Sequence, residues 1–367
     1  MPKFLKKGSL ILFEVTVLTA RENVELLVEQ AIKFEPEHVV ITNEEKYKVV
    51  ADALSSLSTV VHSGDKMLEQ IVKIEEIDIV LTALVGFAGL FPTVSALEAG
   101  KNIALANKET LVVAGELITS LSKQNNCSIY PVDSEHSAVF QCLVGESYSS
   151  IEKILLTASG GPFRGMTLDQ LTRVSKDEAL DHPNWCMGDK VTIDSASLMN
   201  KGLETIEARW LFDLRPDQIE VVVHPESIIH SIVQFFDGSM KAQMGLPDMR
   251  LPIQYALGFP DRLTNNFPRF SFTDYPELHF EKPDTKIFRN LAIAFEAMNR
   301  GGNTPCVMNA ANEIAVEAFL NDSLSFIKIS ELIERTIENI DFIQHPTLED
   351  YKTSDTIARE MAKKLIP

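Results

Sequence analysis

The chain has 367 residues and a formal net charge of −18 at pH 7, with 45% hydrophobic and 23% charged residues. This length allows two or three domains with substantial cores, and the acidic balance argues against a nucleic-acid partner, whose phosphates need clustered Lys and Arg. No run of eighteen apolar residues occurs, so no membrane-spanning helix is expected, and four cysteines without paired spacing indicate reduced thiols in a cytoplasmic protein.

Strand and helix patterns alternate along residues 1–133. Strand-like runs rich in Val, Ile and Leu occur at 13–20, 38–43, 78–84, 102–107 and 128–133. Helical patterns lie between them at 23–34, 44–57, 65–73, 89–99 and 109–123. Apolar strands separated by single helices are typical of a parallel sheet covered on both faces. The sequence therefore predicts an α/β protein with an N-terminal doubly wound, Rossmann-like nucleotide-binding domain.

The glycine-rich turn of such a domain is not found in this sequence. A dinucleotide-binding domain opens with a strand and a turn whose backbone N–H groups hold the pyrophosphate at a helix N-terminus. Between Met1 and Gly64 the only glycine is Gly8, and Gly8-Ser9 alone cannot form that turn. We therefore expect an incomplete parallel sheet, without its first strand and glycine turn.

The rest of the chain divides into three further regions. Residues 134–258 carry alternating strand patterns and helices, with Asp237-Gly238 as a hairpin turn, and predict an α+β domain on a mixed or largely antiparallel sheet. Residues 259–288, with prolines and scattered aromatics, predict a connector. Residues 289–367 have helical patterns only and predict a C-terminal helical bundle.

Two carboxylates stand at the end of the last predicted N-terminal strand. Asp133 and Glu135 are two residues apart, so on a strand both side chains would leave the same face. Such a pair is costly unless a cation or a proton lies between the carboxylates, and oxygen ligands suit Mg²⁺ or Mn²⁺. The alternative is a solvated turn, or Asp133 as a helix N-cap.

A second polar group opens a predicted helix. Asn200, Lys201 and Glu204 fall at the start of this helix, where Asn200 and Glu204 share a face. A surface ion pair with a cap is the plain alternative. Glu204 would add a third carboxylate to the pair described above. The side chains here also form a dense set of phosphate donors: Ser195, Ser197, Asn200 and Lys201.

Two further segments suggest ligand contacts. Ser159-Gly160-Gly161 follows a predicted strand, where glycine lets the backbone approach a ligand closely. The segment that follows exposes a histidine beside large apolar side chains, His182, Trp185 and Met187, and we interpret it as a lid.

Polar residues also follow the strand at 102–107. Asn107, Lys108 and Glu109 stand at the start of a predicted helix, where Lys108 could serve cofactor or substrate. A helix cap with a charged first turn is the alternative. His224 and His230, six residues apart on a predicted strand, are interpreted as structural.

These segments together resemble the 1-deoxy-D-xylulose 5-phosphate reductoisomerases of the non-mevalonate isoprenoid pathway. The matching stretches run from about Phe13 to the C-terminus, and they are ALANKETLV, PVDSEHSAVFQ, LTASGGPFR, HPNWCMG, IDSASLMNKGLETIEARWLF, VVVHPESIIHS, GLPDMRLPIQYA and MNAANEIAVEAFL. The resemblance implies an NADPH-dependent enzyme that converts 1-deoxy-D-xylulose 5-phosphate, a small sugar phosphate, to 2-C-methyl-D-erythritol 4-phosphate. It also implies a homodimer formed through the sheet of residues 134–258.

The resemblance also implies roles for single residues. The ligands of Mg²⁺ or Mn²⁺ would be Asp133, Glu135 and Glu204. The substrate would be held by Lys108, Ser134, Glu135, Ser159, His182, Ser195, Asn200, Lys201 and Glu204. The catalytic group would be Lys108, Glu135, Lys201 and Glu204. NADPH would be contacted by Arg21, Asn23, Asn107, Glu109 and Gly188.

The N-terminus departs from the family pattern. Members begin with a strand and a GSTGSIG-like turn, whereas Phe13 already aligns with their second strand. Glu22, between Arg21 and Asn23, replaces the lysine of the Gly-Lys-Asn found in some relatives. Three readings follow: an active reductoisomerase with a truncated or misassigned start, which we favour; an impaired homologue that binds metal and sugar phosphate without efficient turnover; or a non-catalytic dimeric binding protein on the same scaffold.

Overall fold

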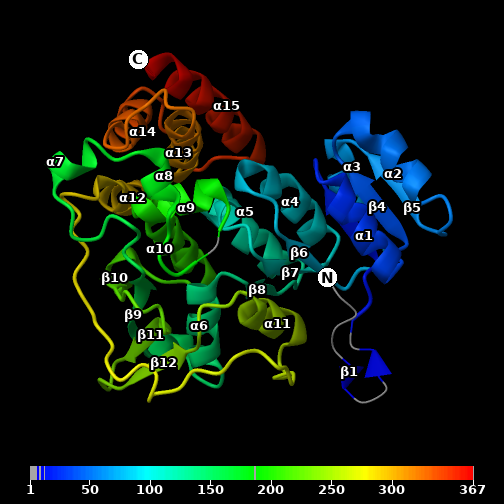
Figure 1. Cartoon of the computed structure of the whole chain (residues 1–367), viewed down its shortest axis with the longest axis horizontal. Coiled ribbons are helices and arrows are strands. Elements are labelled where there is room, and N and C mark those ends of the chain that lie inside the picture. The colour runs from blue at the N-terminus through cyan, green and yellow to red at the C-terminus, as the bar shows by residue number, and fades with distance from the viewer. Residues whose placement is uncertain (1–5, 8–9, 12, 186, 367) are drawn as a thin grey trace.

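The computed structural model describes residues 6–7, 10–11, 13–185 and 187–366 (Figure 1). Gly8 and Ser9 therefore lie outside the described residues. Two short strands, β1 (Lys6–Lys7) and β2 (Leu10–Ile11), pair antiparallel ahead of the first long elements. No helix in the described ranges is both long enough and apolar enough to cross a membrane.

Strands and helices alternate in the N-terminal region, as the sequence predicts. The strands are β3 (Val17–Ala20), β4 (His38–Ile41), β5 (Val60–Ser63), β6 (Ile79–Thr82), β7 (Asn102–Leu105) and β8 (Ile129–Pro131). The helices are α1 (Val24–Phe34), α2 (Tyr47–Ala53), α3 (Asp65–Ile71), α4 (Leu90–Glu98) and α5 (Glu109–Gln124). β5 is not among the predicted strands, because its apolar part, Val60 and Val61, is too short a run to stand out.

The parallel strands form two sheets rather than the one sheet expected. The first sheet has the order β3-β4-β5 and the second the order β6-β7-β8, and all neighbours in both are parallel. Within the described residues no strand pairs with the outer edge of β3 or of β6, so nothing joins the two sheets by hydrogen bonds. The Rossmann-like alternation of parallel strands and helices is therefore present, but its strands are divided between two sheets. The first sheet lies with its helices at one end of the molecule (Figure 1).

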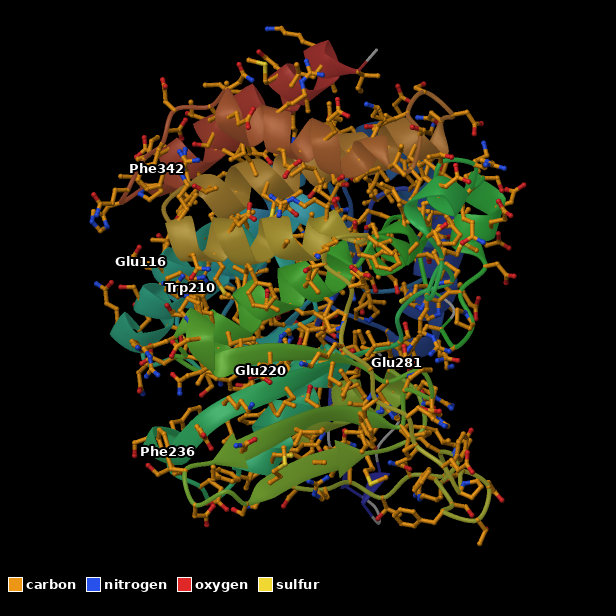
Figure 2. The ribbon with its side chains drawn as sticks, turned by 90° about the vertical axis from the view of Figure 1, so that its left-hand side faces the viewer. Glu116, Trp210, Glu220, Phe236, Glu281 and Phe342 are labelled. Atoms are coloured by element: carbon orange, nitrogen blue, oxygen red, sulfur yellow. The ribbon has the colours of Figure 1, made fainter. Side chains whose placement is uncertain are left out.

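A mixed sheet dominates the middle of the chain. Its strands are β9 (Ile151–Ala158), β10 (Ile219–Val223), β11 (Ile229–Phe235) and β12 (Met240–Met244), in the order β10-β9-β11-β12. β10 is parallel to β9, whereas β11 is antiparallel to both β9 and β12. The predicted Asp237-Gly238 turn joins β11 to β12, and Gly238 has a φ of 83° that favours glycine. Figure 2 shows Phe236, which is 67% exposed, at the outer end of this sheet.

Helices surround this sheet and fill the C-terminal part. In the middle of the chain they are α6 (Ser134–Leu143), α7 (Leu168–Leu171), α8 (Lys176–Leu180), α9 (Asp189–Ala196), α10 (Met199–Leu211) and α11 (Arg250–Gly258). The C-terminal helices are α12 (Arg289–Arg300), α13 (Thr304–Leu320), α14 (Lys328–Glu338) and α15 (Leu348–Leu365). Residues 259–288 contain no helix or strand, and one isolated bridge ties Glu281 to Val223.

The largest hydrophobic core is shared by the middle sheet, α9, α10 and the C-terminal helices. Gly202 shows how closely α10 packs against α12: a Cβ at this position would lie 2.5 Å from the Cβ of Ala294. The glycine therefore costs helix propensity but lets the two helices approach each other. This packing fixes Lys201 and Glu204, on either side of Gly202, in buried positions.

Candidate active site

One cavity gathers the predicted substrate residues. It has a volume of about 340 Å³ and lies where the ends of β7, β8 and β9 meet α9 and α10. All of the residues predicted to hold the substrate line this cavity: Lys108, Ser134, Glu135, Ser159, His182, Ser195, Asn200, Lys201 and Glu204. The chain thus brings together side chains that are almost a hundred residues apart in sequence, such as Lys108 and Glu204.

Three carboxylates converge on one side of the cavity. Asp133, Glu135 and Glu204 each offer an oxygen within 4.8 Å of the others. The strand geometry predicted for the first two is wrong, because β8 ends at Pro131 and Glu135 already lies in the first turn of α6. Asp133 occupies the N-cap position of α6, yet its side chain makes no capping bond there. The carboxylate of Asp133 is instead directed to the cluster.

Two lysines lie among these carboxylates. Lys108 pairs with Asp133 and lies 3.1 Å from Glu204 Oε1, and its Nζ also donates to Asn200 Oδ1 at 2.9 Å. Lys201 donates to Glu135 Oε1 at 2.7 Å and pairs with Glu204 one helical turn away. The two ammonium groups leave three carboxylates with one negative charge in excess.

The crowding of negative charge shifts the pKa values of the carboxylates. Burial, together with the neighbouring Glu135 and Asp133, raises the pKa of Glu204 to about 7. Burial also works against ionisation of Asp133, but Lys108 outweighs it and holds the pKa of Asp133 well below its usual range. A divalent cation would relieve the cost of ionising Glu204, and an all-oxygen donor set suits Mg²⁺ or Mn²⁺. The residues present therefore fit such an ion.

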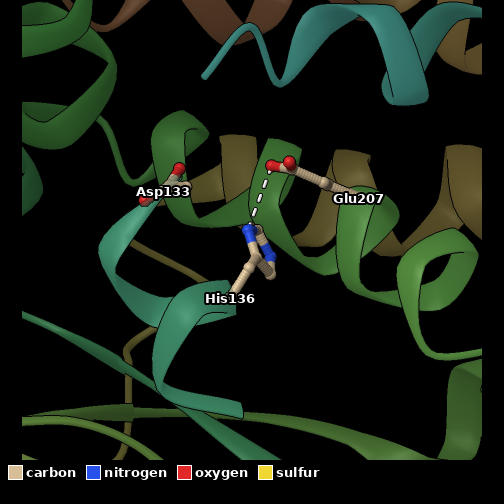
Figure 3. A group of neighbouring side chains, drawn as sticks. All are labelled: Asp133, His136 and Glu207. Carbon is tan, nitrogen blue, oxygen red and sulfur yellow. Dashed lines mark ion pairs between the residues drawn. The ribbon is translucent and has the colours of Figure 1, made fainter. Parts of the chain in front are cut away.

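A fully buried ion pair lies directly behind the cluster. Figure 3 shows His136 between Asp133 and Glu207, with its Nδ1 3.1 Å from Glu207 Oε2. The other ring nitrogen, Nε2, lies 2.9 Å from the backbone carbonyl of Glu204. The contact between Nδ1 and Glu207 is an ion-pair distance rather than a hydrogen bond, and it favours the charged imidazole. Burial would lower the pKa of His136, but Glu207 outweighs it and raises this pKa to about 9.

Hydroxyl and imidazole donors line the same cavity. His182 Nε2 lies 3.0 Å from Ser159 Oγ and 3.1 Å from Ser195 Oγ. His182 Nδ1 accepts from the backbone N–H groups of Asn184 and Trp185, so the proton must be on Nε2. Burial lowers the pKa of His182, in agreement with a neutral ring. Three neutral donors therefore converge in a way that suits an anionic group.

Gly161 explains how the loop after β9 reaches this position. A Cβ at residue 161 would lie 2.8 Å from the backbone oxygen of Ser195, and the residue has a φ of 66°. Only glycine combines this conformation with so close an approach. The sequence predicts that this glycine pair lets the backbone approach a ligand, whereas the close approach made at Gly161 is to the backbone of α9.

Two of the residues predicted to form a lid are part of the cavity lining. Trp185 and Met187 both line it, and the ring of Trp185 packs edge-to-face on His230 with 6.2 Å between the ring centroids. Asn184 donates to Ser227 Oγ at 3.1 Å and to the carbonyl of Pro225. His230 lines the cavity, whereas His224 does not.

The predicted cofactor residues lie outside this cavity. Arg21 is exposed beyond the end of β3, and Asn23 caps α1 by accepting from Leu26 N at 3.1 Å. Asn107 Oδ1 accepts from Thr110 N at 2.9 Å, and Gly188 is the N-cap residue of α9. Glu109 is buried and paired with Lys190 at 2.7 Å. Asn107 and Glu109 flank Lys108, which does reach the cavity.

Some contacts of the site were not predicted from the sequence. His136 and Glu207 belong to the motifs already singled out, but their pairing joins α6 to α10 and no local spacing announces it. The same holds for Asn184 with Ser227, and for Lys190 with Glu109. Of these residues, only His136 could have been singled out from the sequence as a site residue, because it directly follows Asp133 and Glu135.

Comparison with known proteins identifies the family. Family models match in three parts: 1-deoxy-D-xylulose 5-phosphate reductoisomerase at residues 9–115, its C-terminal domain at 129–212, and the DXP reductoisomerase C-terminal domain at 244–361. A 1-deoxy-D-xylulose 5-phosphate reductoisomerase of Bacteroides fragilis is 60% identical over 355 residues, covering 97% of this chain and 92% of that protein. One of Porphyromonas gingivalis is 54% identical over 356 residues, with 97% and 92% covered.

Solved structures agree with the sequence relatives. The reductoisomerase of Zymomonas mobilis in complex with NADPH superposes with a TM-score of 0.90 at 39% identity, covering 96% of this chain and 92% of that chain. A DOX-P reductoisomerase in complex with NADPH, fosmidomycin and magnesium gives a TM-score of 0.91 at 38% identity, with 96% and 91% covered. With relatives of this identity matched over nearly its whole length, the chain belongs to the 1-deoxy-D-xylulose 5-phosphate reductoisomerase family.

Proposed function

We propose that this protein converts 1-deoxy-D-xylulose 5-phosphate to 2-C-methyl-D-erythritol 4-phosphate with NADPH and Mg²⁺ or Mn²⁺, a step of isoprenoid synthesis. Family membership supports the reaction, and the relatives of solved structure carry NADPH and magnesium. The observation that carries the proposal for this chain is the cavity itself, which three carboxylates and two lysines line together with a group of neutral phosphate donors.

The carboxylates and lysines would serve the reacting end of the substrate. Asp133, Glu135 and Glu204 would hold the cation, which when bound polarises the oxygens of the hydroxyketone, while NADPH supplies the hydride. Lys108 and Lys201 lie within 3.1 Å of these carboxylates and would orient the substrate oxygens and balance charge as it develops.

Ser159, His182 and Ser195 would hold the phosphate through their converging donors. Asn200 and Lys201, which contact Glu204 on α10, would add donors from the side of the carboxylates. Trp185 and Met187 line the cavity and would close over the substrate, excluding water from the rearranging carbon skeleton. Arg21, Asn23, Asn107, Glu109 and Gly188 would contact NADPH; of these, Asn107 and Glu109 adjoin the cavity through Lys108.

Domain limits, assembly and location are part of the same proposal. We infer a nucleotide domain at 1–133, a metal-binding and dimerisation domain at 134–258, a connector at 259–288 and a helical domain at 289–367.

A homodimer through the middle sheet is supported by its edge strand β12 and by the exposed Phe236 and Met240. The free, buried thiols of Cys127, Cys142 and Cys306 support a cytoplasmic location.

The experiment is NADPH oxidation followed by absorbance, with 1-deoxy-D-xylulose 5-phosphate and Mn²⁺. NADPH oxidation that requires both the sugar phosphate and Mn²⁺ would support the proposed reductoisomerase activity. Binding of the sugar phosphate without oxidation would favour an impaired homologue, and binding of neither ligand would favour the non-catalytic scaffold. Sedimentation analysis of the same preparation tests the dimer.

A further inference from the structure

Lys190 is a mostly buried ammonium group that the proposed reaction does not use. It lies in the first turn of α9, and only 18% of its side chain is exposed. Its Nζ is 2.7 Å from Glu109 Oε1 and 2.8 Å from Asp194 Oδ2. Both carboxylates are buried, so this one lysine bridges α5 and α9 inside the protein.

Contacts continue from Lys190 toward the predicted cofactor side. The second oxygen of Glu109 accepts from Asn107 Nδ2 at 3.2 Å. The same amide group donates to the carbonyl of Gly86 at 2.9 Å, in the 3₁₀ turn before α4. The Asn107 and Glu109 side chains therefore have their positions set together with Lys190.

Contacts also continue from Lys190 toward the phosphate side. Asp194 adjoins Ser195 on α9, and Ser195 Oγ lies 3.1 Å from His182 Nε2. The second carboxylate oxygen of Asp194, Oδ1, accepts from Asn312 Nδ2 at 2.8 Å. This hydrogen bond anchors Asp194 to the buried helix α13. A shift of Asp194 would consequently move Ser195 and the donors around it.

We propose that Lys190 is a positioning residue that couples NADPH binding to phosphate binding, by holding Glu109 and Asp194 in one rigid unit. This proposal rests on the proposed function, because it assigns the two sides of the unit to the two ligands. Loss of the ammonium would leave Glu109 and Asp194 buried with only their amide partners, Asn107 and Asn312, and with no cation bridging them, so it should cost more than the loss of an exposed ion pair. Coupling between sites is reciprocal, so it is measurable from either ligand.

The test compares Lys190→Met and Lys190→Arg with wild-type protein. The Kd of NADPH is measured from its fluorescence, with and without saturating fosmidomycin. We expect fosmidomycin to tighten NADPH binding roughly tenfold in wild type, within the range of 5–150-fold typical of coupled sites. Lys190→Met should lose this tightening and should raise the KM of both substrates, whereas Lys190→Arg should keep most of both.

Two more variants keep the test decisive. Lys153→Met removes a lysine that pairs with Glu220 at 2.9 Å on the middle sheet, and it should leave the coupling unchanged. Asn312→Ala removes the anchor of Asp194 without leaving a buried charge unpaired, and it should weaken the coupling even if Lys190→Met does not fold.

The outcomes separate this proposal from the proposed function. Wild-type protein that binds neither compound would overturn both. Wild-type protein that binds both without coupling, or coupling that survives intact in Lys190→Met and Asn312→Ala, would overturn the role of Lys190 alone. A lower melting temperature with unchanged KM values and coupling would mean that Lys190 only stabilises the fold.

Discussion

Lys201 Nζ donates to Glu135 Oε1 at 2.7 Å and so joins the first turn of α10 to the first turn of α6. Each of these two helices carries a part of the acidic cluster, Glu204 on α10 and Glu135 on α6. The lysine is 3% exposed, so its charge acts with little screening by water.

Replacement of Lys201 tests this arrangement. Lys201→Met should lower kcat/KM by about 100-fold or more, as expected when a buried donor to developing charge is removed. Steady-state kinetics with 1-deoxy-D-xylulose 5-phosphate provide the measurement. Lys153→Met, which breaks a partly exposed ion pair outside the site, should stay close to wild type. Equal losses in the two variants would argue against a special role for Lys201.

Divalent cations should stabilise the fold through the acidic cluster. Ligand that binds only the folded state adds about 2.7 kcal/mol at a hundredfold excess over its Kd, so Mn²⁺ should raise the melting temperature. Glu204→Gln and Asp133→Asn should lose most of this shift. Glu220→Gln, a change at an exposed carboxylate on β10, should retain it. A shift of the same size in all four proteins would place the ion elsewhere.

The His136–Glu207 pair predicts a pH dependence of stability. The folded-state pKa of His136, about 9, lies above the ordinary histidine value of 6.5, so the folded state holds an extra proton between these values. The stability from this proton is fully present below about pH 6.5 and is lost as the pH rises through about 9. Its upper limit is about 3 kcal/mol.

Urea unfolding at a series of pH values measures this contribution. Wild type should lose stability toward alkaline pH more steeply than Glu207→Gln, in which the partner of His136 is uncharged. Other groups titrate in the same range, but they are common to both proteins and cancel in the difference. Parallel stability curves for the two proteins would mean that His136 is neutral in the folded state.

Gly202 predicts a stability effect that depends on its neighbour. Gly202→Ala should destabilise the protein by about 1–3 kcal/mol, because the added Cβ would overlap Ala294. The double variant Gly202→Ala with Ala294→Gly should recover part of the loss, and thermal or urea unfolding measures both. Gly188→Ala, where nothing lies within 4 Å of the added Cβ, is the matched control for stability. A double variant no better than the single one would contradict the proposed contact.

The sequence predicted most of the candidate site because its parts lie in short, dense motifs. Asp133 and Glu135 follow a strand, and Lys201 and Glu204 open a helix, so local spacing alone suggests that each set is organised. The position of Glu135 was misjudged because the strand ends two residues before Asp133, at Pro131. The carboxylates nevertheless converge, because tertiary packing of α6 against α10 decides the geometry.

Long-range pairs could not be predicted in the same way. Glu109 and Lys190 are 81 residues apart, and each alone looks like a charged first turn of a helix. The division of the parallel strands into two sheets was likewise not predicted, since periodicity identifies strands but not which edges pair.

The central claim is that this cavity carries out the reductoisomerase reaction. The most direct measurement incubates the protein with 1-deoxy-D-xylulose 5-phosphate, NADPH and Mn²⁺ and identifies the product by NMR, alongside Glu204→Gln. The account predicts 2-C-methyl-D-erythritol 4-phosphate in equal amount to the NADPH consumed, with little or none from the variant. NADPH consumption without this product, or equal product from Glu204→Gln, would contradict it.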